Sequence, residues 1–242
     1  MNILSLFAGI GGLELGLERA GLGTTRWQVE IEPFNRKVLA AHWPDAERFA
    51  DVRDVSAEDF PGCDVICGGF PCQDISSAGK REGIDGQRSG LWREFARLIG
   101  EIRPRIVVVE NVPDLAVRGL GRVLGDLCAL GYDAEWEIVS AFDAGAPHLR
   151  KRLFILATHA DSERAQVSPS GEQSREPMPQ RSRWWQVEPE VGPVADGLPG
   201  RVAQLRALGN AVVPQVAELV GRRALRILER GAVDDDPWDL RP

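Results

Sequence analysis

Short apolar runs alternate with segments of helical periodicity through most of this chain. The first two runs are Ile3–Leu6 and Trp27–Ile31. Each is followed by apolar residues at helical spacing, namely Leu13, Leu17 and Ala20 after the first run, and Phe34, Val38 and Ala41 after the second. A strand-length apolar run followed by an amphipathic helix is typical of βαβ units. The alternation therefore predicts an α/β fold.

The same alternation continues through the middle of the chain. Further strands are expected at Asp64–Cys67, Arg105–Glu110, within Tyr132–Ser140 and at Leu153–Thr158. Helices are expected between them over Leu91–Ile102 and Leu120–Leu130. Because continuous apolar strands need burial on both sides, we expect a Rossmann-like, mostly parallel sheet with helices on both faces.

The pattern breaks after a first domain of residues 1–158. Asp161–Arg183 is rich in Ser, Glu, Gln, Pro and Arg and shows neither the periodicity of a strand nor that of a helix. Residues 159–200 are therefore interpreted as a very small insertion, a short candidate segment for target recognition. Leu205 to Leu228 is interpreted as a loop and a helix that return to the core within residues 201–230. Residues 231–242 form an acidic tail.

Composition argues against several classes of protein. The 43% of hydrophobic residues suits a soluble globular protein. No stretch approaches the roughly 18 apolar residues of a membrane span, and no positive residue precedes the first apolar run, so we expect a cytoplasmic protein without a membrane segment. The four cysteines form no C-x-x-C pair and the three histidines add no metal-ligand spacing. Neither a disulfide framework nor a bound metal is indicated.

Charge is unevenly distributed along the chain. The net charge of −7 by itself argues against a nucleic-acid partner. Residues 144–230, however, carry 13 basic and 9 acidic side chains, and nearly all the basic ones are arginines. Arginine suits bidentate contacts to phosphates and bases. This segment is compatible with a nucleic-acid contact and also with an ordinary mixed surface.

A glycine-rich turn, Phe7-Ala8-Gly9-Ile10-Gly11-Gly12, lies between the first expected strand and the first helix. Glycines there let a ligand approach the backbone and the N–H groups of the helix end. Glu30, at the end of the second strand, is placed to accept hydrogen bonds from ribose hydroxyls, and Asp51 could accept one from an adenine amino group. The turn departs from G-x-G-x-x-G, which disfavours a nicotinamide dinucleotide. A turn that serves packing alone is the alternative.

Two chemically active residues follow adjacent expected strands. Cys72 lies in Gly68-Gly69-Phe70-Pro71-Cys72-Gln73, and Glu110 follows three valines. Open α/β sheets bind ligands at the carboxyl ends of their strands, so the two side chains can converge. A carboxylate in that position is costly without a partner, although a glutamate that caps a turn is the alternative. Cys63 and Cys67 are expected to pack in the core.

Five motifs occur in the order found in one enzyme family. They are Phe-Ala-Gly-Ile-Gly-Gly, Gly-Gly-Phe-Pro-Cys-Gln, Glu-Asn-Val, Arg150-Lys151-Arg152 and Gly209-Asn210-Ala211-Val212. With them the chain resembles the DNA (cytosine-5)-methyltransferases from its start to Gly221, apart from residues 159–200. The resemblance implies contacts to the cofactor S-adenosylmethionine from Phe7, Gly9, Gly11, Glu30, Asp51 and Asn210. It also implies that Cys72, Glu110 and Arg152 surround a cytosine and that Arg150 holds a DNA phosphate.

The resemblance implies a mechanism as well. Carbon 5 of cytosine is a poor nucleophile until Cys72 adds to carbon 6. Glu110 would favour that addition by hydrogen bonding and proton donation at ring nitrogen 3, while Arg152 binds the carbonyl oxygen. Carbon 5 then attacks the sulfonium methyl group, and loss of its proton expels the cysteine. The target base must first leave the DNA stack.

Two segments are expected to contact DNA. Asp74–Gly90 is interpreted as a mobile loop that closes over the flipped nucleotide, with Ser76 and Arg88 toward the DNA, or else as an ordinary surface loop. The inserted segment is expected to be a minimal recognition element that is poorly ordered without DNA. Its arginines for phosphate or guanine are Arg164, Arg175, Arg181 and Arg183. Trp184 and Trp185 either pack on the core or contact bases.

Two departures from the family pattern affect the interpretation. His148 stands where the family has Gln, a change that keeps a hydrogen-bonding side chain. The recognition region is far shorter than in the family, which leaves DNA specificity open and favours a short site or a partner chain. The alternatives are a tRNA cytosine-5 methyltransferase of the same family and a catalytically weak, DNA-binding regulatory relative. The sequence does not set the oligomeric state.

Overall fold

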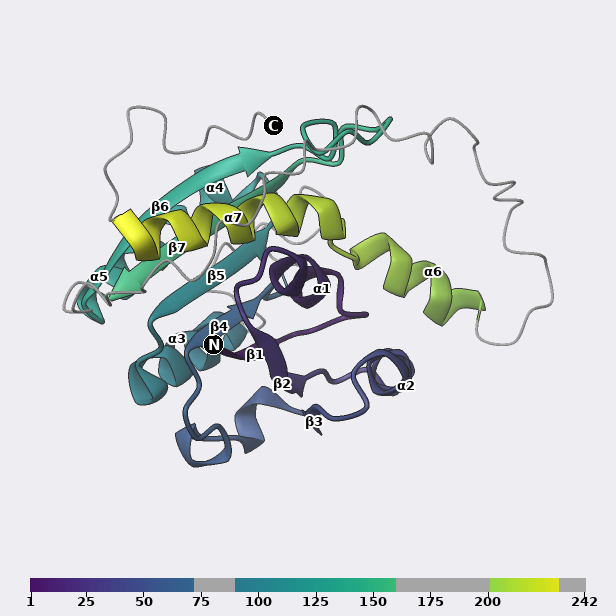
Figure 1. The fold of residues 1–242 in the computed structure, drawn as a ribbon, viewed down its shortest axis with the longest axis horizontal. Coiled ribbons are helices and arrows are strands. Elements are labelled where there is room, and N and C mark those ends of the chain that lie inside the picture. The colour runs from purple at the N-terminus through teal and green to yellow at the C-terminus, as the bar shows by residue number, and fades with distance from the viewer. Residues whose placement is uncertain (72–89, 160–200, 231–242) are drawn as a thin grey trace.

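The computed structural model describes residues 1–71, 90–159 and 201–230 (Figure 1). Its strands are β1 (Asn2–Leu6), β2 (Thr24–Val29), β3 (Glu47–Phe49), β4 (Val65–Gly68), β5 (Ile106–Asn111), β6 (Tyr132–Val139) and β7 (Arg152–His159). Within the described residues they form one seven-stranded sheet in the order β3-β2-β1-β4-β5-β7-β6. The expected α/β fold with a mostly parallel sheet is confirmed.

Strand direction determines which residues meet at one edge of the sheet. The five strands from β3 to β5 are parallel, whereas β7 runs antiparallel between β5 and β6. The amino-terminal end of β7 therefore lies beside the carboxyl end of β5, with Asn111 opposite Leu153. Arg152, the first residue of β7, is thereby brought next to Glu110 although it lies 42 residues later in the chain.

Helices cover both faces of the sheet, as expected. They are α1 (Gly12–Arg19), α2 (Pro33–His42), α3 (Gly90–Ile102), α4 (Leu115–Arg118), α5 (Leu120–Ala129), α6 (Arg201–Asn210) and α7 (Pro214–Arg230), with short 3₁₀ helices η1 (Val52–Asp54) and η2 (Ala57–Asp59). On one face α1 and α7 bury Leu17 and Val220 against Ile3 and Val108. On the other face α3 and α5 pack on Leu4 and Val107. The apolar strands are thus buried on both sides.

A buried ion pair ties the last described helix to the sheet. Arg223 of α7 is 1% exposed, and its Nε and Nη2 donate to the two carboxylate oxygens of Glu135 in β6, each at 2.7 Å. A bidentate arginine–carboxylate pair of this kind fixes geometry as well as charge. It therefore sets the position of α7 across β6 and β7 (Figure 1).

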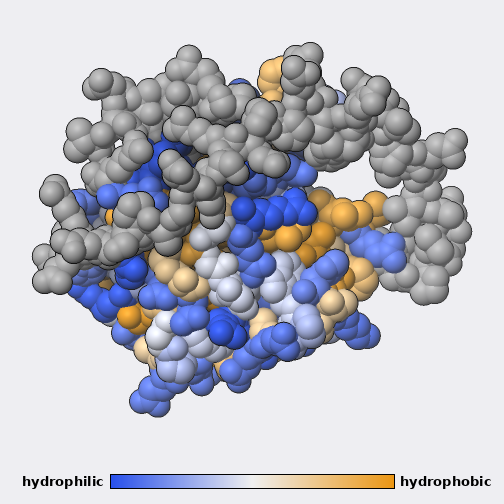
Figure 2. Space-filling view, in the orientation of Figure 1, coloured by the Kyte–Doolittle hydropathy of each residue, from blue (hydrophilic) through white to orange (hydrophobic). Residues whose placement is uncertain are grey.

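The carboxyl-terminal part differs from the expectation in one respect. Much of the expected loop before the last helix is itself a helix, α6, and the true break is the short turn at residues 211–213. The apolar side chains Val202, Leu205 and Leu208 of α6 are exposed, and Figure 2 shows hydrophobic surface over this helix. Because these residues do not face the core, their spacing gave no sign of a packed helix.

Several expectations fall on residues that the structure does not describe. Residues 160–200 and 231–242 lie outside the described ranges, so the proposed recognition segment and acidic tail stay predictions. Among the described helices, none is long and apolar enough to cross a membrane. In the same part of the chain, no group of His, Cys, Asp and Glu side chains is arranged to hold a metal ion. The expected cytoplasmic location stays a prediction.

Candidate active site

Glu110 and Arg152 form a paired centre at the edge of the sheet. Glu110, near the end of β5, is only 8% exposed. The Nε atom of Arg152 lies 3.0 Å from Oε1 of Glu110. The antiparallel pairing of β5 with β7 produces this contact, which provides the partner that a buried carboxylate needs.

The Glu110 carboxyl is poised to exchange a proton near neutral pH. Burial raises its pKa from an ordinary 4.5 to about 7, and the nearby charges of Arg152 and Arg150 oppose this rise without cancelling it. The Glu110 carboxyl therefore keeps its proton to a higher pH than an ordinary glutamate does. A group with such a pKa can act as a general acid at neutral pH, whereas an exposed glutamate would be almost fully ionised.

The backbone before Cys72 is fitted closely to this centre. A Cβ atom on Gly69 would lie 2.5 Å from Oε2 of Glu110, so a side chain there would displace the carboxylate. The buried Asn111 amide donates to the Phe70 carbonyl at 3.2 Å and accepts from the Val112 N–H at 2.8 Å. Gly69 and Asn111 both stand in the motifs described above, but the sequence did not predict these contacts. Together they hold the segment that leads to Cys72.

Glu30 faces the glycine-rich turn at the carboxyl end of β2. It directly follows β2 and is 7% exposed. Its Oε2 accepts from the N–H of Gly9 at 2.7 Å, and its Oε1 accepts from the N–H of Glu32 at 2.8 Å. Burial raises the Glu30 pKa, while these two backbone hydrogen bonds act in the opposite direction. A carboxylate has lone pairs beyond these two, so it can also accept from ligand hydroxyls.

The turn itself leaves room for a ligand. Phe7 and Gly9 both have positive φ angles, 56° and 59°. The Phe7 ring stacks on Phe95 with centroids 6.3 Å apart, which holds the turn onto α3. A Cβ atom on Gly9 would meet no atom of the described residues within 4 Å. The space above the turn is therefore open, as a backbone approached by a ligand requires.

Asp51 and Asn210 are two further residues expected at the cofactor. Asp51 caps η1, and both of its oxygens accept hydrogen bonds from Arg53, including one from Nε at 2.9 Å. These contacts lower the Asp51 pKa to about 2, so the side chain is an ionised acceptor. Asn210 is exposed at the end of α6. The cofactor contacts expected of both residues stay predictions.

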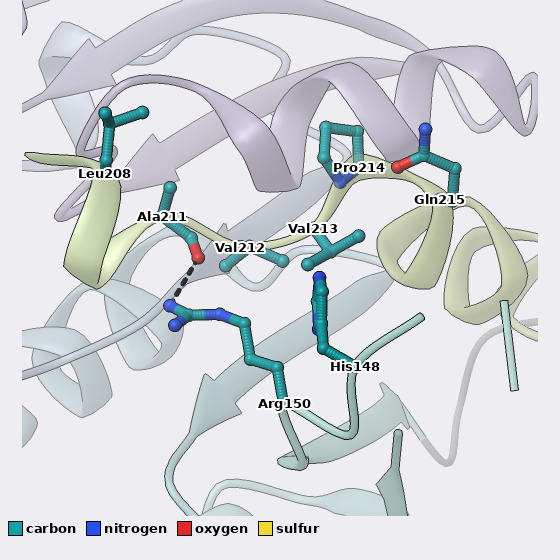
Figure 3. Close-up of a pocket in the computed structure, with 8 residues that line it drawn as sticks. All are labelled: His148, Arg150, Leu208, Ala211, Val212, Val213, Pro214 and Gln215. Carbon is teal, nitrogen blue, oxygen red and sulfur yellow. Dashed lines mark hydrogen bonds between the residues drawn. The ribbon is translucent and has the colours of Figure 1, made fainter. Parts of the chain in front are cut away.

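A cavity of about 400 Å³ lies beside Arg150, between the approach to β7 and the turn after α6 (Figure 3). Its lining residues are His148, Arg150, Leu208, Ala211, Val212, Val213, Pro214 and Gln215. Nη2 of Arg150 donates to the carbonyls of Gly209 at 2.8 Å and Ala211 at 2.7 Å. The phosphate contact expected of Arg150 stays a prediction, and its observed partners are carbonyls of the chain itself.

The nucleophile and most of the expected DNA contacts lie outside the described residues. These are Cys72, Ser76, Arg88, Arg164, Arg175, Arg181 and Arg183, together with Trp184 and Trp185. Pro71 is described and exposed, so the chain enters the Cys72 segment at the edge of the sheet that carries Glu110. Cys67 is buried in the core as expected, in the cluster that also holds Ile3 and Val108, and the half-buried Cys63 packs against the other cluster, which holds Leu4 and Val107.

Comparisons with known proteins define the class. The family "C-5 cytosine-specific DNA methylase" matches residues 1–198. The type II methyltransferase M2.BsuMI of Bacillus subtilis is 38% identical over 166 residues, which cover 65% of this chain and 42% of that protein. M1.ScrFI of Lactococcus lactis is 36% identical over 159 residues, which cover 64% of this chain and 41% of that protein. The chain belongs to the C-5 cytosine-specific DNA methylase family.

Solved structures agree with this assignment. One, described as a candidate DNA modification methyltransferase encoded within a prophage (E. coli), matches with a TM-score of 0.56 and 31% identity over 66% of this chain and 47% of that chain. The Dnmt2 methyltransferase of S. pombe shares the fold, with a TM-score of 0.56 and 21% identity over 73% of this chain and 58% of that chain. The matched part spans less than half the length of the two type II methyltransferases.

Proposed function

We propose that this chain is a DNA cytosine-5 methyltransferase that uses S-adenosylmethionine. The observation that carries the proposal is the buried Glu110 carboxyl, with a pKa of about 7, paired with Arg152 at 3.0 Å. Cytosine presents ring nitrogen 3 beside a carbonyl oxygen. A proton donor next to a cationic donor matches these two groups.

Each residue of the centre has a defined task in this proposal. Cys72 adds as a thiolate to carbon 6 of the flipped cytosine and forms a carbon–sulfur bond. Glu110 donates its proton to ring nitrogen 3, which takes up the electron pair displaced by the addition. Arg152 binds the carbonyl oxygen and keeps Glu110 oriented. Carbon 5 is then electron-rich enough to take a methyl group. Glu110 would afterwards take back the proton from ring nitrogen 3, and water would accept the proton of carbon 5. The electron pair of that carbon–hydrogen bond would re-form the double bond between carbons 5 and 6 as Cys72 departs as a thiolate.

The residues near the glycine turn suit S-adenosylmethionine. Glu30 and Asp51 are acceptors for hydroxyl and amino groups, and the open space above Gly9 admits a ligand next to the backbone. The cofactor supplies a methyl group on a sulfonium sulfur when bound. Phe7, Gly11 and Asn210 complete the set that would hold it.

The decisive experiment identifies the methylated nucleic acid. The protein is incubated with labelled S-adenosylmethionine and separate pools of DNA and tRNA, which are then digested to find the modified base. Label in 5-methylcytosine from DNA supports the proposal, and label only in tRNA supports the alternative of a tRNA methyltransferase. Cofactor binding without transfer to either pool would instead indicate a regulatory relative.

We further propose that DNA recognition requires a short target site or a partner chain. Only residues 160–200 separate the end of β7 from the start of α6. The type II relatives are more than twice as long as the parts that match this chain. A recognition element of this size reaches few base edges. Duplex binding by the purified chain alone tests the proposal, because sequence-selective binding to a long site would contradict it.

A further inference from the structure

Arg150 makes contacts that neither the sequence motif nor the proposed chemistry explains. The two hydrogens of its Nη2 atom point to the carbonyls of Gly209 and Ala211, at 2.8 and 2.7 Å. These carbonyls flank Asn210, the last residue of α6, and Figure 3 shows the guanidinium reaching toward the turn at Ala211. The Arg150 side chain thus holds the turn on both sides of Asn210, a residue that is expected to contact the cofactor.

The chemistry of the contact is favourable on both sides. The last carbonyls of a helix have no partner within the helix, and this end carries the negative pole of the helix dipole. A guanidinium supplies positive charge and hydrogen-bond donors in fixed directions. In this position Arg150 acts as a cap for the end of α6.

The backbone next to Arg150 is held in place as well. Ser140, 6% exposed, directly follows β6, and its Oγ donates to the Leu149 carbonyl at 2.7 Å. The same Oγ accepts from the N–H of Phe142 at 3.1 Å. Ser140 therefore closes the connection between β6 and β7 immediately before Arg150, and a fixed backbone gives the arginine a defined reach.

The turn at residues 211–213 also contacts the start of α1. A Cβ atom on Gly12 would lie 2.2 Å from the Val212 carbonyl, so the two backbones are in close contact. Gly12 is the last residue of the glycine-rich turn that faces Glu30 and the first residue of α1. A shift of the turn at residues 211–213 would therefore disturb the cofactor side of the sheet.

We propose that Arg150 is a positioning residue for the cofactor. By holding the carbonyls of Gly209 and Ala211, it keeps Asn210 and the start of α1 in the arrangement that binds S-adenosylmethionine. The inference rests on the proposed function. It gives Arg150 a role distinct from the phosphate contact that the family resemblance implies, and the two roles make different predictions.

The test compares three variants with the wild type. Arg150→Ala removes both carbonyl contacts, and Arg150→Lys keeps the charge without the fork of donors. Lys151→Ala removes a neighbouring exposed charge and leaves the turn untouched. Each protein is measured for S-adenosylmethionine affinity without DNA, for KM and kcat in methylation, and for the salt dependence of binding to duplex DNA of mixed sequence. Hydrogen exchange of residues 208–213 is followed in the absence of ligands.

Positioning predicts that Arg150→Ala weakens cofactor binding by about tenfold, the scale of a lost charged hydrogen bond. Saturating cofactor should restore most of kcat, Arg150→Lys should be intermediate, and Lys151→Ala should match the wild type in cofactor affinity. The salt slope should be unchanged in Arg150→Ala, whereas a phosphate contact predicts a slope smaller by about one. Exchange at residues 208–213 should become faster.

Unchanged cofactor affinity in a folded Arg150→Ala protein would overturn the inference, whatever the salt slope. If that variant does not fold, Ser140→Ala serves in its place. It frees the Leu149 carbonyl and should also lower cofactor affinity, so an unchanged affinity would overturn the inference.

A wild type that binds no S-adenosylmethionine would instead refute the proposed function. In that case faster exchange at residues 208–213 in Arg150→Lys would still support the role of the contact, and unchanged exchange would overturn it.

Discussion

The proton on Glu110 makes the stability of the fold depend on pH in a way that one substitution isolates. Burial raises the Glu110 pKa from 4.5 to about 7, so the folded chain binds this proton more tightly than the unfolded chain. Between these two values the folded state carries more protons, and the free energy of unfolding falls as pH rises. The stabilising contribution is complete below the unfolded pKa and is lost above the folded one.

The expected size follows from the shift. A difference of about 2.5 pKa units corresponds to about 3 kcal/mol between the two protonation states. Glu110→Gln cannot ionise, so the variant's free energy of unfolding minus that of the wild type should rise by about this amount from pH 4.5 to pH 8. Any constant cost of the amide cancels in this comparison. Glu14, another buried glutamate whose pKa burial raises to about 7, is present in both proteins and cancels as well.

Urea unfolding, followed by tryptophan fluorescence at several pH values, measures the difference directly. Glu47→Gln makes the same chemical change at an exposed position and serves as the control. Stability curves of Glu110→Gln and wild type that run parallel across the whole pH range would show that burial does not hold a proton on Glu110. The assignment of this residue as a proton donor would then lose its physical basis.

Other consequences can be checked separately. Glu110→Gln should retain cofactor binding and lose most single-turnover methylation, and a near-normal rate would refute its role. A duplex with 5-fluorocytosine should trap the wild type, but not Cys72→Ser, in a denaturant-resistant adduct; methylation of ordinary DNA without trapping would exclude the covalent mechanism. Arg223→Ala removes the bidentate partner of Glu135 and should lower the free energy of unfolding by about 3 kcal/mol or more in urea titrations. Replacing residues 161–183 by a Gly/Ser chain should weaken DNA binding and flatten its salt dependence with cofactor affinity unchanged; an unchanged salt slope and unchanged methylated sites would place specificity elsewhere.

The sequence predicted most of the fold because apolar periodicity reports burial. The strands expected at residues 64–67 and 105–110 lie within one residue of β4 and β5. Periodicity failed where an element makes little contact with the core. Helix α6 buries Ala207 but exposes Leu205. The direction of β7 is also set by its pairing in the sheet, which no local pattern encodes.

The sequence predicted the reactive side chains of the candidate site but did not predict the contacts that hold them in place. The family resemblance implied that Glu110 and Arg152 lie together, and the sheet brings them into contact. The fit of Gly69 against Glu110 and the grip of Arg150 on the turn after α6 depend on distances between segments far apart in the sequence. A single sequence carries the residue types for such contacts without the geometry that joins them.

The packing of α7 on α1 has a consequence for how the chain is made. During synthesis the amino-terminal half emerges first, and its apolar residues Leu13 and Leu17 pack against α7 only once Val216 and Val220 follow. Among the described elements, α7 completes the cover of the inner strand β1 on that face, so this side of the core closes only after residues 214–230 have been made. Nascent chains that stop before Pro214 should expose this surface to aggregation and proteolysis and should not accumulate as a smaller folded domain.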